Sequence, residues 1–135
     1  MTVKIKIMDL DKPNLNGVVF TEDAIKNACG QIKDLDIPVV YNSDTSENSS
    51  DSIKIGDIIG FANLLEENYP AMSFRANIGH ERFKDSLRNG WGGFGPNYKA
   101  STKFDDDIIV VTDAEIDTIG YTMTPASETS YEIIK

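Results

Sequence analysis

The chain has 135 residues, enough for one domain with a single modest core, and 40% of them are hydrophobic, as in folded soluble proteins. Thirteen basic residues against twenty-two acidic ones give a formal net charge of -9, which disfavours direct contact with nucleic acid phosphates. Cys29 is the only cysteine, so an internal disulfide and a cysteine-based metal site are excluded. The chain starts without the apolar core of a signal peptide and has no run long enough to cross a bilayer, so we expect no membrane partner.

Hydrophobic periodicity predicts the elements of the first part of the chain. Residues 3–7 alternate between apolar residues and lysine, which indicates a half-buried strand. A turn separates them from a short extended stretch at 18–20. Apolar residues at helical spacing then predict an amphipathic helix over 22–33, with Thr21 as its N-cap. Cys29 falls within the apolar stripe of this helix, so we expect a buried small hydrophobe rather than a reactive thiol.

Turn residues and further apolar runs divide the remainder of a single domain that spans residues 1–135. The expected elements are, in chain order, a strand at 37–41, a mobile serine-rich loop at 42–52, a hairpin of strands at 53–65 and 71–78, a short helix holding Phe83 and Leu87, a strand after Gly90, a turn at 103–107, one long or two consecutive strands at 108–124, and a tail or edge strand at 125–135.

Gly90, Gly92 and Gly95 match the spacing G-x-G-x-x-G, which occurs in loops that bind dinucleotides. Such a loop needs a strand before the glycines and a helix after them, so that the pyrophosphate meets a helix N-terminus. Here a helix precedes the glycines, and Pro96 favours an extended segment after them. We therefore interpret the glycines as a helix stop followed by a strand that something approaches closely.

Few residues offer recognisable chemistry. His80, the sole histidine, lies at the start of a charged helix, where a solvated side chain is the ordinary interpretation. The acidic run at 105–107 has adjacent carboxylates without the ligand spacing of a calcium loop, so we expect a solvated turn and no metal or other cofactor. The aromatic residues Trp91, Phe94 and Tyr98 surround the glycines, and either core packing or a partner-binding surface would explain them.

Four segments stand out in order along the chain: "PNLNGVVFTEDAIKNA", "IPVVYNSD", "LRNGWGGFGPNYKAS" and "DAEIDTIGYTMTPAS". In their order and spacing they resemble the prohead proteases of tailed bacteriophages, serine proteases related in fold to herpesvirus assemblins. Together they cover most of residues 12–127. The resemblance implies an α+β fold, with a small, mainly antiparallel, β-barrel-like sheet flanked by two or three short helices.

Carried over by the resemblance, the family's catalytic histidine falls on Ser43, its nucleophilic serine on Gly95 and its acidic residue on Asp117. Glycine has no nucleophile, and serine is no base near neutral pH, so the serine protease mechanism lacks two of its three groups. Ser101 lies six residues beyond Gly95, or about 20 Å along a strand, which is too far to substitute. We therefore expect a pseudoenzyme without catalytic residues.

The resemblance, together with the missing nucleophile and base, predicts a non-enzymatic bacteriophage virion protein. We expect it to be made in the bacterial cytoplasm and to have a capsid-associated, decoration or head-assembly role. Its expected partners are capsid or other virion proteins, and self-association into a homo-oligomer is compatible with that role. Two alternatives stay open: an active prohead maturation protease of the serine type with an unrecognised residue set, and a soluble ligand- or protein-binding module outside phage biology.

Overall fold

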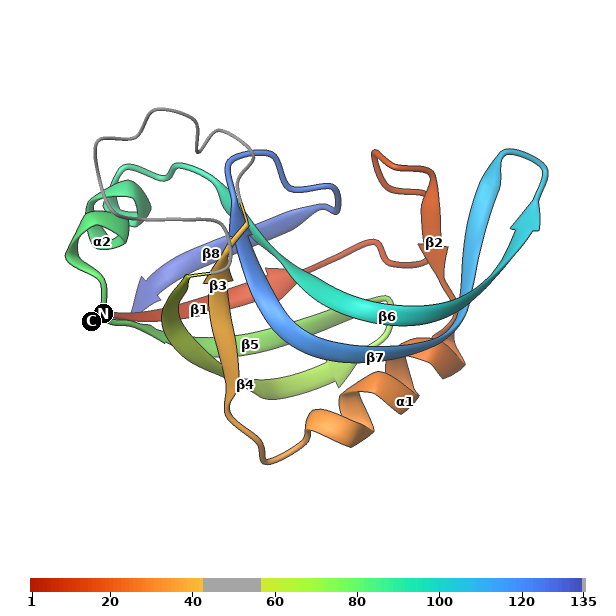
Figure 1. Cartoon of the computed structure of the whole chain (residues 1–135), viewed down its shortest axis with the longest axis horizontal. Coiled ribbons are helices and arrows are strands. Elements are labelled where there is room, and N and C mark those ends of the chain that lie inside the picture. The colour runs from red at the N-terminus through yellow and green to blue at the C-terminus, as the bar shows by residue number, and fades with distance from the viewer. Residues whose placement is uncertain (43–56, 135) are drawn as a thin grey trace.

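A computed structural model of the chain describes residues 1–42 and 57–134 (Figure 1). Its elements are, in chain order, β1 (Thr2–Ile7), β2 (Val18–Phe20), α1 (Glu22–Ile32), β3 (Ile37–Tyr41), β4 (Ile58–Asn68), β5 (Ala71–Ile78), α2 (Glu81–Arg88), β6 (Gly93–Asp105), β7 (Ile108–Thr122) and β8 (Thr129–Ile134).

The strands form one curled sheet in the order β2-β7-β3-β4-β5-β1-β8, with β6 paired to β7 off this path (Figure 1). Most neighbouring strands are antiparallel, but β2 and β3 both run parallel to β7. The expectation of an α+β fold dominated by a curled, mainly antiparallel sheet is therefore confirmed. The parallel contacts, which give β7 partners on both of its edges, were not predicted.

The core lies inside the curl of the sheet and beneath α1. Val3, Ile5 and Ile7 on β1 are fully buried, as their alternation with lysine predicts. The Thr21 hydroxyl accepts a hydrogen bond of 3.2 Å from the Ala24 amide, so Thr21 is the N-cap that the sequence predicts. The apolar face of α1 packs against β7 and β4, which fixes the helix across one side of the sheet.

The predicted boundaries differ most around β4 and at the C-terminus. Strand β4 runs to Asn68, three residues beyond the predicted end, because the hairpin turn consists only of Tyr69 and Pro70. The start predicted for this strand and residues 43–52 of the predicted loop lie outside the described residues. Of the two interpretations of the C-terminal segment, the edge strand is confirmed, since β8 pairs with β1.

The order of helix, glycines and strand around β6 is also confirmed. The amide of Gly90 donates to the Leu87 carbonyl at 3.0 Å, and Gly90 has a φ of +73°, as a glycine that ends a helix commonly does. Gly92 has a φ of +71°, and β6 begins at the next residue. The chain therefore enters β6 through two left-handed glycines rather than starting a new helix.

Candidate functional site

Gly95 lies in a cleft of about 440 Å³ beside β6. Hereafter "the cleft" denotes this space. Its lining residues are Asn14, Asn16, Val18, Phe20, Asn42, Gly95, Pro96, Asn97, Tyr98, Gly120, Thr122, Thr124, Pro125, Ala126 and Ser127. They come from the loop before β2, from β2 itself, from the end of β3, from β6 and β7, and from the segment before β8.

Two glycines leave part of the cleft without side chains. Gly95 on β6 stands directly opposite Gly120 on β7. A Cβ added to Gly95 would have no atom within 4 Å, so the space above this backbone is open. The neighbouring position Gly93 differs, because a Cβ there would lie 2.8 Å from Pro125 and 2.9 Å from Thr129. The opening is therefore local to Gly95.

Amide side chains form the polar wall of the cleft. Asn42 Nδ2 donates to Asn97 Oδ1 at 2.9 Å, and Asn97 Nδ2 donates to Thr118 Oγ1 at 2.9 Å. This chain of hydrogen bonds crosses from the end of β3 to β7 over Gly120. A Cβ on Gly120 would lie 2.9 Å from Asn42 Nδ2, so glycine is needed for the close approach.

The aromatic wall comes from Phe20 and Tyr98, whose rings meet edge to face with centroids 5.1 Å apart. Burial raises the pKa of the Tyr98 hydroxyl above its ordinary value, so the hydroxyl stays protonated near neutral pH. Val18 extends this wall along β2. None of the fifteen described residues that line the cleft has a charged side chain, although 26% of the whole chain is charged. The cleft is thus suited to an uncharged occupant, because a buried charge without a partner is costly.

The cleft lies beside β6 and is not confined to one face of this strand. Gly95, Pro96, Asn97 and Tyr98 are consecutive, and consecutive strand residues point to opposite faces, yet all four line the cleft together with Gly120 and Thr122 of β7. Within the described part of the chain, β6 is paired with β7 alone. Its other edge presents backbone amide and carbonyl groups that another extended strand can bind.

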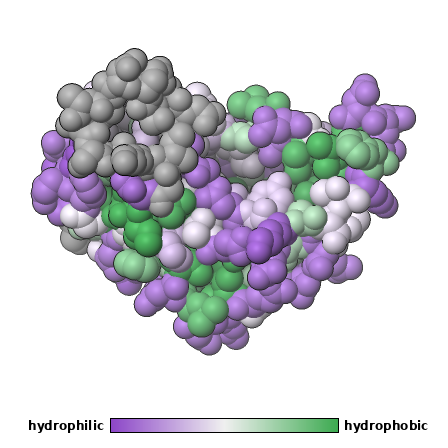
Figure 2. All heavy atoms as spheres, in the orientation of Figure 1, coloured by the Kyte–Doolittle hydropathy of each residue, from purple (hydrophilic) through white to green (hydrophobic). Residues whose placement is uncertain are grey.

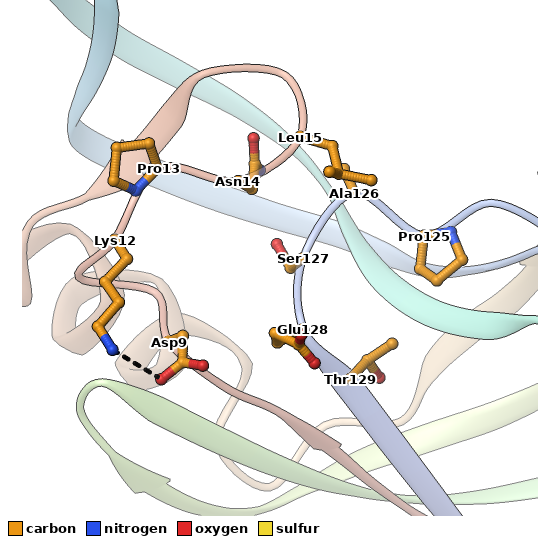
Figure 3. Close-up of a pocket in the computed structure, with 10 residues that line it drawn as sticks. All are labelled: Asp9, Lys12, Pro13, Asn14, Leu15, Pro125, Ala126, Ser127, Glu128 and Thr129. Atoms are coloured by element: carbon orange, nitrogen blue, oxygen red, sulfur yellow. Dashed lines mark ion pairs between the residues drawn. The ribbon is translucent and has the colours of Figure 1, made fainter.

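A second cleft of about 470 Å³ adjoins the first and shares Asn14 and the segment 125–127 with it. Figure 3 shows its lining, in which Lys12 forms an ion pair with Asp9 at 3.9 Å. A hydrogen bond of 3.0 Å from the Leu15 amide to the Ala126 carbonyl ties together the two loops that border both clefts. Unlike the first cleft, the second contains charged side chains and no residue for which the sequence suggested a role.

Of the protease-equivalent positions, the structure describes Gly95 and Asp117, and only Gly95 lines the cleft. Asp117 is exposed at an irregularity of β7, between the residues paired with Asn97 and Tyr98, and it does not line the cleft. Ser43 lies outside the described residues.

His80 lies at the N-cap of α2 and does not line the cleft. Its ring meets Phe83 edge to face at a centroid distance of 5.3 Å. Among the described residues its side chain makes no hydrogen bond to a serine or threonine hydroxyl, so no Ser–His pair is formed there.

The three aromatic candidates do not share a surface. Phe94 is fully buried and packs against the Tyr121 and Tyr131 rings, so it serves the core. Tyr98 lines the cleft, and Trp91 is 59% exposed on the loop between α2 and β6. Of the two interpretations that the sequence left open, core packing therefore describes Phe94, and only Tyr98 contributes to the cleft.

The other chemical candidates remain apart from the cleft. The acidic run follows β6 at its hairpin with β7, where Asp106 has a φ of +56°. No group of three or more His, Cys, Asp or Glu residues suited to a metal ion occurs within residues 1–42 and 57–134. Cys29 is buried, and its Sγ lies 3.9 Å from Met72 Sδ. Over the same residues, no helix has the length and apolar character needed to span a bilayer.

Sequence reasoning missed the amide wall. Asn42 was assigned to the start of a loop, and Asn97 was considered only as part of the strand after the glycines. The available signal was an asparagine inside a strand, which is an unfavourable position unless its side chain has partners.

No family model matches the chain, and neither a curated protein nor a solved structure does.

Proposed function

We propose that the chain is a non-enzymatic bacteriophage virion protein on a scaffold similar to that of the prohead proteases, and that its cleft holds an extended segment of another virion protein. The observation that carries this proposal is the open backbone of Gly95 in an uncharged cleft beside β6, a strand that is paired with β7 alone in the described part of the chain. The resemblance supplies the phage setting, and the cleft supplies the mode of binding.

The residues at the cleft favour binding of a polypeptide over its hydrolysis. Acyl transfer needs a nucleophile and a base within hydrogen-bond distance of each other. The residue at the protease-equivalent nucleophile position has no side chain, and the acidic Asp117 is exposed and does not line the cleft. An extended polypeptide, in contrast, needs only backbone hydrogen bonds along one strand and space for its side chains, and β6 has one edge without a described strand partner and the cleft beside it.

The cleft's lining also limits what it holds. With amides, hydroxyls and two aromatic rings but no charge, it fits an uncharged stretch of polypeptide better than an acidic or basic one. A ligand backbone can approach β6 closely above Gly95, where no side chain intervenes.

Two experiments test the proposal. The first co-expresses the chain with the capsid and scaffold proteins encoded beside it, and measures their intact masses. We expect no processing; cleavage that Asp117→Ala abolishes would show triad chemistry and overturn the non-enzymatic assignment. The second is quantitative mass spectrometry of purified particles of the phage that encodes the chain. A fixed copy number per particle is expected, and complete absence would reject the virion role.

A further inference from the structure

We propose that copies of this chain associate head to tail, with the tip of the β6–β7 hairpin of one copy seated in an apolar hollow at the opposite end of the next. This inference goes beyond the proposed function, because it uses no residue of the cleft. It is built from two surfaces that the fold places far apart.

The first surface is the hairpin tip, residues 103–107. Every residue of β6 from Lys99 to Asp105 is exposed, and the hairpin tip extends from the body at one end of the molecule (Figure 1). Phe104 is 78% exposed at its end. The three aspartates that follow Phe104 are exposed and form no ion pair with another described residue. The tip therefore presents one phenyl ring beside a concentration of negative charge that a single lysine, Lys103, offsets in part.

The second surface is an apolar hollow of about 500 Å³ where β4 begins and β5 ends. Its lining residues are Met1, Ile58, Ile59, Gly60, Phe61, Asn77, Ile78, Gly79, His80 and Lys84. Ile58 is 57% exposed and Phe61 is 51% exposed. Two large apolar side chains that stay half exposed beside a hollow of this size are unusual on a surface in contact only with water.

Basic groups surround the hollow. Lys84 and His80 line it. Arg75 lies two residues before the lining residue Asn77 on β5, and Lys4 on β1 stands opposite Arg75 on the exposed side of the sheet. Three carboxylates accompany them, since Asp57 directly precedes Ile58, Glu81 binds Lys84 at 2.8 Å and Glu132 stands opposite Lys4 on β8. With His80 neutral, lysine and arginine side chains thus equal the carboxylates here, whereas the chain as a whole has a net charge of -9.

The two surfaces are complementary in both hydropathy and charge. A phenyl ring followed by three carboxylates matches an apolar hollow bordered by lysine and arginine. Figure 2 shows hydrophobic surface over the first part of β4, and hydrophobic beside strongly hydrophilic surface on the hairpin at the other end. Because the hairpin and the start of β4 lie toward opposite ends of the long axis, they cannot meet within one molecule (Figure 1).

A second copy of this chain is therefore the occupant that fits. Contact between two different surfaces of identical copies is heterologous, so each copy keeps one surface free and the association continues into a ring or a filament. Such repetition suits a protein present in many copies in a symmetric particle.

Sedimentation velocity of the full chain between about 10 and 500 µM, the range of a weak contact, tests the inference. We expect the average mass to rise with concentration above the chain mass of 14.9 kDa. Phe104→Ser and Phe61→Ser should each weaken association about tenfold or more, as truncation of an aromatic anchor does. Leu15→Ser, at an apolar residue that is 84% exposed on neither surface, is the matched control and should change nothing.

Mixing the two variants gives the decisive result. The Phe104→Ser chain has an unaltered hollow, and the Phe61→Ser chain has an unaltered hairpin tip. The mixture should therefore form dimers of twice the chain mass and nothing larger. A charge-reversed pair, Asp105→Lys and Arg75→Glu, provides the same test without removing apolar surface. A wild-type chain that stays monomeric at all concentrations overturns the inference. So does association that survives either serine substitution, or a mixture that yields no dimer.

Discussion

The phenolic hydroxyl of Tyr121 donates a hydrogen bond of 2.6 Å to the backbone carbonyl of Trp91. Tyr121 lies near the end of β7, and Trp91 lies in the loop that leads from α2 into β6. The hydroxyl of Tyr131, on β8, donates to the same carbonyl at 2.9 Å. Tyr121 on β7 and Tyr131 on β8 thus both bind the loop that precedes β6. The start of β6 is therefore positioned by side chains that are distant in sequence.

Removal of both hydroxyls should cost more than the sum of the single losses. Tyr121→Phe or Tyr131→Phe leaves the Trp91 carbonyl with one donor, and each should lower the free energy of unfolding by about 0.5–1.5 kcal/mol. The double variant leaves the carbonyl without either donor, so a coupling of at least about 0.5 kcal/mol is expected. Urea unfolding of the four chains measures it, with Tyr41→Phe as the control for loss of a phenolic hydroxyl. Strict additivity would show that the two bonds do not share the carbonyl in solution.

Burial of the Tyr121 phenol also makes the free energy of unfolding depend on pH in the alkaline range. Burial raises the pKa of Tyr121 to about 12, from an ordinary value of about 10. Because the pKa is raised in the folded state, its contribution to stability is complete below pH 10 and is lost as the pH rises toward 12. We expect the free energy of unfolding to fall by roughly 1–3 kcal/mol across this window, since one pKa unit corresponds to about 1.4 kcal/mol.

The Tyr121→Phe chain tests this assignment, because it has no phenol to ionise at that position. Urea unfolding at intervals from pH 9 to pH 12 should give a visibly shallower decline for the variant than for the wild type. Parallel declines in the two chains would assign the alkaline loss to other groups, such as Tyr131 or Cys29, whose pKa values burial also raises.

Local signals predicted most elements, and nonlocal pairing accounts for most of what they missed. Thr21 and the apolar stripe behind it define α1, because a cap and a helical period depend on residues within a few positions of each other. The parallel contacts of β7 join segments far apart in the chain, and nothing in the alternation of either strand specifies the partner.

The cleft could be predicted only in part, for the same reason. The resemblance placed Gly95 at the equivalent of a nucleophile, and the structure puts it in an open cleft. The bond between Asn42 and Asn97, which are 55 positions apart, forms only when β3 and β6 are both packed on β7. The uncharged lining likewise arises only in the folded chain, because its fifteen residues come from several separate segments.

Gly95 and Gly60 should respond in opposite ways to alanine. Gly95→Ala meets open space, so we expect unchanged stability or a gain of up to about 1 kcal/mol, as the unfolded chain loses freedom. Gly60→Ala would place a Cβ 2.1 Å from the Asn77 carbonyl oxygen, a backbone atom held by the β4–β5 pairing, so a loss of about 1–3 kcal/mol or more is expected. Thermal unfolding of the two variants measures both. An equal loss at both positions would mean that the cleft above Gly95 is filled in solution.

Cys29 should be inert to alkylation until the chain unfolds. Its side chain is buried on α1 against Met72, and burial raises the pKa of the thiol to about 12, so almost none of it is the reactive thiolate near neutral pH. Iodoacetamide at pH 8, followed by intact-mass analysis, should modify the native chain roughly a thousandfold more slowly than the chain in concentrated urea. As a matched control, Ser101→Cys in a Cys29→Ala background carries its thiol on the exposed part of β6 and should react at the rate of a free cysteine. Rapid labelling of wild-type Cys29 under native conditions would mean that α1 separates from the sheet far more often than its packing implies.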